Sequence, residues 1–107
     1  MPHYLIQVAY TPEAWATMSK NPQDRGQLVR PAVEALGGTL EQFYMSFGEY
    51  DVHAIAQFPS NVDAAAFAIS AAAGGAVRTF RTTPLFESEE AVEAMRRSGT
   101  SPYNPPG

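Results

Sequence analysis

An aspartate and a histidine near the middle of the chain have the residue types and spacing best suited to chemistry. Asp51 and His53 are two positions apart, so on an extended strand their side chains point to the same face. A histidine beside a carboxylate can act as a general base, with the carboxylate orienting its ring, or as a metal ligand. The alternative is structural: Asp51 caps a hairpin turn, and His53 forms hydrogen bonds across an interface between subunits. The sequence alone leaves both interpretations open.

A second group of side chains is expected to hold a ligand near this pair. Tyr44 can bind or protonate a substrate oxygen, and Gln7 and His3 lie on a neighbouring predicted strand. Arg78 and Arg81 are three positions apart and therefore point to opposite faces of a later strand. We expect Arg78 to balance an acidic ligand. The alternative for either arginine is a salt bridge at the surface or between subunits.

Two further alternatives involve metal and amine chemistry. Two histidines and one aspartate match the facial triad that holds non-haem iron, although the spacing of His3, Asp51 and His53 is not specific for it. Removal of Met1 would leave Pro2 as a secondary amine, the base used by tautomerases, although Met-Pro is also a frequent start of processed proteins. The sequence contains neither G-x-G-x-x-G nor a phosphate-binding loop. We therefore predict no cofactor and no metal.

The Asp-His pair belongs to two strands predicted over residues 39–47 and 50–58, joined by a tight turn at Gly48-Glu49. Alternation assigns apolar side chains to the packed face of these strands, namely Phe43, Met45, Phe47, Val52, Ala54, Ala56 and Phe58. The opposite face of the second strand carries Asp51, His53, Ile55 and Gln57. An apolar face opposite a mixed face is typical of a strand in a sheet that is covered on one side.

Capping residues and periodicity predict the other elements. The predicted strands cover residues 3–10 and 76–86, and the predicted helices cover residues 12–19, 24–36, 61–73 and 89–97. Pro31 predicts a kink or a restart of the second helix near Arg30. The third helix is expected to pack through Val62, Ala66, Ile69 and Ala73. Residues 98–107, rich in Pro and Gly, are expected to form a flexible tail.

The β-α-β-β-α-β order predicts a ferredoxin-like α+β fold: a four-stranded antiparallel sheet with both helices on one face and the first and third strands in the centre. Residues 1–97 form the predicted domain. On its open face, Leu5, Tyr44 and Ile55 favour burial among polar neighbours. A second copy packed sheet to sheet would bury them and leave a polar-lined cavity. We therefore expect a homodimer or a higher homo-oligomer.

Composition narrows the classes of function. The chain has 107 residues, a net charge of −4 and no cysteine. Because 7 Lys and Arg stand against 11 Asp and Glu without a basic run, nucleic-acid binding is disfavoured. The lack of cysteine excludes disulfides and cysteine-ligated zinc. No segment is typical of a signal peptide or of a membrane span, so we predict a cytoplasmic protein.

Four short motifs resemble the GYD domain family, small bacterial and archaeal proteins of the dimeric α/β-barrel group. They are Met1-Pro2-x-Tyr4, Leu36-Gly37-Gly38 before a strand, Gly48-Glu49-Tyr50-Asp51, and Val77-Arg78-Thr79 after an alanine-rich helix. The resemblance covers roughly residues 1 to 95. It implies a self-associating sheet that closes into a dimeric barrel, but it implies no agreed activity and transfers no catalytic residue.

Two hypotheses about function follow. The first is a site for a compact, partly apolar small molecule on the open sheet face. If it is catalytic, it would resemble the cofactor-independent monooxygenases, decarboxylases or isomerases of the same barrel group. His53 would accept a proton, Asp51 would orient it, and Tyr44 or Arg78 would hold an oxyanion. The second hypothesis is a non-catalytic binding or assembly module whose sheet face is only an interface.

Overall fold

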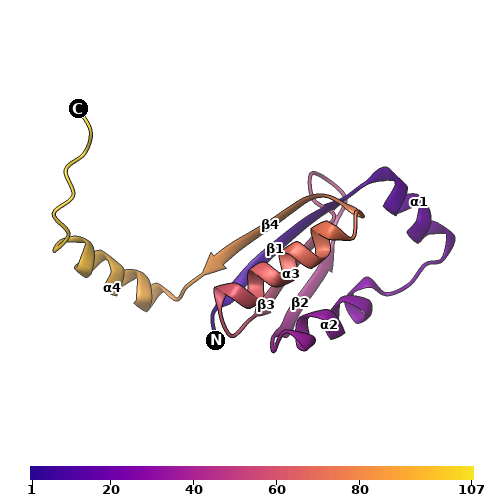
Figure 1. Cartoon of the computed structure of the whole chain (residues 1–107), viewed down its shortest axis with the longest axis horizontal. Coiled ribbons are helices and arrows are strands. Elements are labelled where there is room, and N and C mark those ends of the chain that lie inside the picture. Colours follow the sequence, from indigo (N-terminus) through magenta and orange to yellow (C-terminus); the bar gives the residue numbers. More distant parts are fainter.

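The computed structural model describes residues 1–107 and contains a single four-stranded sheet with four helices (Figure 1). The elements are β1 (His3–Tyr10), α1 (Pro12–Lys20), α2 (Arg25–Ala35), β2 (Thr39–Met45), β3 (Val52–Gln57), α3 (Asn61–Ala73), β4 (Val77–Leu85) and α4 (Ser88–Ser98). The strand order is β2-β3-β1-β4, and every neighbouring pair is antiparallel. This architecture confirms the α+β prediction and is consistent with a ferredoxin-like fold in which β1 and β3 are central.

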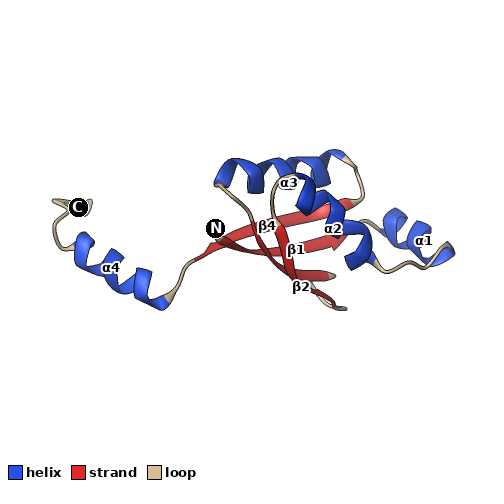
Figure 2. Cartoon of the chain, turned by 90° about the horizontal axis from the view of Figure 1, so that it is seen from below, coloured by secondary structure: helices blue, strands red, loops and turns tan.

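The core lies between the sheet and the helices α2 and α3, which cover the same face (Figure 2). Alternate residues of the central strands point into it, and they are Tyr4, Ile6, Val8, Val52, Ala54 and Ala56. The predicted alternation of these strands is therefore confirmed. Gly38 allows β2 to start close to this core, because a Cβ there would lie 2.5 Å from the carbonyl oxygen of Gln57.

The connection between β2 and β3 is longer than the predicted tight turn. The backbone amide of Ser46 donates to the carbonyl of Asp51, and the amide of Asp51 donates to the carbonyl of Val8. These two bonds hold residues 46–51 as a loop, so β2 ends at Met45 and β3 begins at Val52. The prediction that Phe47 packs in the core is wrong, because its side chain lies in this loop and is fully exposed.

Helix α3 packs through a different face from the predicted one. Val62 and Ile69 are 77% and 68% exposed, whereas Ala64 is buried and Phe67 packs against the core. The Phe67 ring lies 5.8 Å from the ring of Phe58 and 5.9 Å from that of Phe80. Burial of one aromatic ring outweighs burial of smaller side chains, so Phe67 determines which side of this alanine-rich helix faces the sheet.

Helix α2 runs through Pro31 as one uninterrupted element, so the predicted restart does not occur. Asp24 caps its first turn by accepting from the backbone amide of Gln27. The side chain of Arg30 donates to the carbonyl of Leu40 at 3.0 Å and ties α2 to the start of β2.

The C-terminal helix α4 projects away from the sheet and its two covering helices (Figures 1 and 2). Glu87 and Glu90 form a capping box at its start, and Val92 and Met95 are exposed on it. Residues 99–107 beyond it form neither helix nor strand. None of the four helices has the length and apolar character that crossing a bilayer requires.

Candidate functional site

The register of the sheet places four polar side chains in one row on its uncovered face. His53 pairs with Tyr44 on one side and with Gln7 on the other, and Gln7 pairs with Arg81. Directly opposed residues of antiparallel strands share a face, so we name Tyr44, His53, Gln7 and Arg81 the polar row. The neighbouring row is more apolar, because Leu5 and Ile55 pair at its centre.

The histidine of the polar row is held by a chain of hydrogen bonds. His53 Nε2 lies 3.1 Å from Ser46 Oγ, and Nδ1 lies 3.4 Å from Gln7 Nε2. Because the Ser46 hydroxyl donates its only proton to the Tyr50 carbonyl, it must accept from His53. This assigns the proton to Nε2 and leaves the lone pair of Nδ1 toward Gln7. The ring of Tyr50 meets the His53 ring edge-on at 6.2 Å.

Asp51 does not orient His53, which corrects the predicted catalytic pair. Its Oδ2 accepts from the backbone amide of Tyr10 at 2.8 Å and from the indole nitrogen of Trp15 at 3.3 Å. The reason is its position: Asp51 closes the loop before β3 instead of lying within the strand, so the two-residue spacing does not place it beside His53. Ser46 and Gln7 orient the histidine instead.

His3 lies far from His53 on the same open face. It pairs with Gln57 in the register, and its Nε2 lies 3.1 Å from Oε1 of Glu41. Four positions of β1 separate it from Gln7, which is about 13 Å along a strand. The facial triad considered from the sequence therefore does not form, and the structure contains no group of three His, Cys, Asp or Glu side chains that could hold a metal ion.

Tyr44 and Arg78 are both exposed at the edges of the sheet. The Tyr44 hydroxyl donates to Gln42 Oε1 at 3.1 Å, and its side chain lies in the polar row. Arg78 is the extra residue where the register between β1 and β4 shifts, so it has no partner on β1. Arg81, not Arg78, is the arginine of the polar row.

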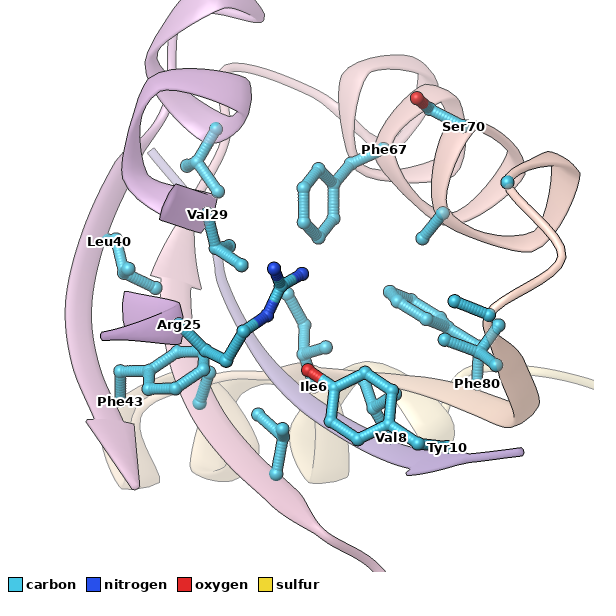
Figure 3. A pocket seen from close by; sticks show the side chains of 17 residues that line it. Ile6, Val8, Tyr10, Arg25, Val29, Leu40, Phe43, Phe67, Ser70 and Phe80 are labelled. Carbon is cyan, nitrogen blue, oxygen red and sulfur yellow. The ribbon is translucent and has the colours of Figure 1, made fainter. Parts of the chain in front are cut away.

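A separate cavity lies on the opposite, helix-covered side of the sheet. It has a volume of about 250 Å³, lies between α2, α3 and the sheet, and is partly open to the surface; 14 of its 17 lining residues are hydrophobic. Figure 3 shows the Arg25 guanidinium reaching in among these side chains, between Phe67 and Tyr10. The sequence did contain a signal for the position of Arg25. This residue is four and eight positions before Val29 and Val33, so it lies on the same face of the helix as these two apolar residues.

Comparison with protein families gives one match, in which the model for the GYD domain covers residues 4–95. The chain belongs to the GYD domain family. No curated protein and no solved structure matches its sequence. The match runs from β1 into α4 and so includes both the polar row and the helix-side cavity of this GYD domain. In the Gly48-Glu49-Tyr50-Asp51 loop, the backbone carbonyl of Tyr50 accepts a hydrogen bond from the Ser46 hydroxyl. The Asp51 carboxylate accepts from the backbone amide of Tyr10 and from the indole nitrogen of Trp15.

Proposed function

We propose that this GYD domain protein is a homo-oligomeric small-molecule-binding protein whose ligand lies between two copies, on the open face of the sheet. The observation that supports this most is the polar row beside the Leu5–Ile55 pair. Both apolar side chains are partly exposed in the middle of an uncovered sheet face. A second sheet packed on them removes apolar surface from water, and the polar row then borders an enclosed space.

The polar row also suits a ligand with an acidic or carbonyl group. Arg81 supplies a cation at one end of the row, in the role that the sequence assigned to Arg78, and Tyr44 supplies a hydroxyl at the other. Between them, His53 Nδ1 meets Gln7 only at 3.4 Å, a weak contact that a ligand proton can replace. The row therefore has the basic group that a cofactor-independent monooxygenase or isomerase would need.

The second candidate is a non-catalytic assembly module. It is favoured by the fact that both ring nitrogens of His53 already have neighbours within the chain, Ser46 and Gln7. In that case the open face only completes an interface, and His53 stabilises the β2–β3 loop.

Native mass spectrometry compared with the denatured mass tests both candidates. We expect the wild-type protein to be a dimer or a multiple of it, with an added small mass if a ligand is bound. Ile55→Lys places a charge at the centre of the open face and should give monomers. Val62→Lys, on the exposed face of α3, is the matched control and should leave the oligomer intact.

The variant His53→Ala distinguishes a ligand site on the open face from a face that is only an interface. For a ligand site, His53→Ala keeps the oligomer and loses the added mass. For an interface alone, no added mass is found and His53→Ala weakens the oligomer. A monomeric wild-type protein would overturn both candidates.

A further inference from the structure

The helix-side cavity is separate from the polar row, because the sheet lies between them. The central strands present Ile6, Val8 and Val52 to the cavity and His53 and Gln7 to the open face. The cavity therefore does not need a second copy of the chain to be complete. Nothing in the proposed function of the open face uses it.

The cavity is larger than the voids that an ordinary core leaves, and it is partly open to the surface. Protein interiors are close-packed, and their few voids are seldom larger than a water molecule. The cavity has a volume of about 250 Å³, whereas an engineered apolar cavity of about 150 Å³ already binds benzene. There is room for a six-membered ring with a short substituent. Phe67, Phe80 and Val29 supply apolar walls for it (Figure 3).

One charged group is placed in this apolar surrounding without a partner. Arg25 Nε is buried and makes no hydrogen bond, and none of the three ion pairs in the structure includes Arg25. The neighbouring carboxylate of Asp24 is engaged in capping α2. By contrast, Arg30 on the same helix donates to a backbone carbonyl. The Arg25 side chain as a whole is half-buried, and its buried Nε is left without an acceptor, so an anion that accepts from this nitrogen would satisfy the group.

The shape of the guanidinium and the nature of the walls together define the ligand class. A guanidinium binds a carboxylate through two parallel hydrogen bonds, whereas the walls offer almost no other polar partner. A strongly hydrated anion such as free phosphate would leave most of its oxygens unsatisfied there. A carboxylate with an apolar body satisfies both the cation and the walls.

The cavity adjoins the surface on the α1 side. A shallower hollow next to α1 shares Tyr10, Arg25, Gly74 and Ala76 with the cavity. Arg25 therefore lies at the border between the apolar interior and the surface. This position suits a carboxylate that enters with its apolar end first and stays at the mouth.

We infer that the cavity between α2, α3 and the sheet is a binding site for a small apolar carboxylate, with the carboxylate on Arg25 and the apolar body between Phe67 and Phe80. The site lies within one chain and is independent of the open-face site.

Isothermal titration calorimetry on the full chain tests this inference with two probes, phenylacetate and the neutral 2-phenylethanol. Wild-type protein should bind phenylacetate at least about tenfold more tightly, since a hydrogen bond to a charged group contributes that much. Arg25→Met keeps an unbranched apolar stem and removes the charge, so phenylacetate should bind at least about tenfold more weakly, whereas the affinity for 2-phenylethanol should not change. Arg97→Met, at an exposed arginine of α4, is the matched control and should bind both probes as the wild type does.

Three outcomes overturn the inference: no phenylacetate binding to the wild type at millimolar concentration, equal affinity for the two probes, or unchanged phenylacetate affinity in Arg25→Met. Should Arg25→Met fail to fold by circular dichroism, the wild-type comparison and nuclear magnetic resonance shifts decide. Phenylacetate is expected to shift the amides of Phe67 and Phe80. Shifts confined to the open face, around His53, would place the probe elsewhere and refute the site.

Discussion

Asp51 gives the most direct test of the corrected site, because the structure shows its carboxylate bonded to the backbone and to Trp15 and not to His53. Its Oδ2 accepts from the backbone amide of Tyr10 and from the indole of Trp15. Tyr10 is only 7% exposed, and Asp51→Ala leaves its amide without a protein acceptor. An unsatisfied buried donor costs about 1–3 kcal/mol, and the longer bond to the exposed Trp15 adds about 0.5 kcal/mol.

Asp51→Ala should therefore lower the free energy of unfolding by about 2 kcal/mol, which corresponds to a fall in Tm of about 10 °C for a domain of this size. Asp51→Asn keeps one acceptor for the Tyr10 amide and should lose roughly half as much. Urea unfolding followed by the fluorescence of Trp15, the only tryptophan, measures these values. Trp15 packs edge-on against Tyr10 at 5.6 Å, so its emission should also change in the folded variants.

Glu49→Ala is the control, because this exposed loop carboxylate makes no hydrogen bond or ion pair in the structure. It should change the free energy of unfolding by less than about 0.5 kcal/mol. Two results would refute the reasoning: equal stability of Asp51→Ala and Glu49→Ala, or a loss of ligand binding by Asp51→Asn at unchanged stability. The second result would restore the catalytic role that the sequence suggested.

Two further predictions concern backbone packing and the C-terminal helix. Gly38→Ala should destabilise the domain by at least about 2 kcal/mol, because a Cβ at Gly38 would lie 2.5 Å from a β3 carbonyl oxygen, whereas Gly48→Ala, with nothing within 4 Å, should be nearly neutral. Urea unfolding of the two variants compares them, and equal midpoints would contradict the close approach. Deletion of residues 87–107 should change the free energy of unfolding by less than about 1 kcal/mol, since α4 projects away from the sheet. A larger loss in the same assay would show that α4 packs in solution.

Alternation predicted the faces of the sheet well, because a period of two determines the side to which each side chain points. Tyr4, Ile6 and Val8 could face only one side, and the structure buries all three. Once β1 and β3 are adjacent, alternation places Gln7 and His53 on the same face, whereas their direct pairing is set by the register of the two strands. The sequence could therefore predict which residues lie on the open face.

The predictions failed where local pattern does not determine geometry. Asp51 continues the alternation of β3 in sequence, yet the backbone leaves the strand there, and only the bonds of residues 46 and 51 show it. In α3, alanine occurs on every side, so periodicity could not choose a face until the ring of Phe67 met Phe58 and Phe80. The choice between Arg78 and Arg81 depended on a register shift that no single-strand pattern contains.

Arg25 shows a different limit of sequence reasoning. Periodicity predicted the helix that contains Arg25, but it assigned no role to the charged residue itself. Physical chemistry gives the opposite weight to such a residue, because a cation on a buried stripe is costly unless something pairs with it. A charge that falls on the apolar face of a predicted helix is therefore worth testing as part of a binding site.

The alternation that defines the sheet also keeps its two candidate sites independent. Ile6 and Val8 border the cavity, while Gln7 between them belongs to the polar row. Arg25 lies on α2 and does not reach the open face, and Ile55 is not among the residues that line the cavity. A change at Ile55 therefore reports on assembly alone, and a change at Arg25 reports on the cavity alone. If both changes altered the same ligand, the two faces would share one site, and the separation by the sheet would be wrong.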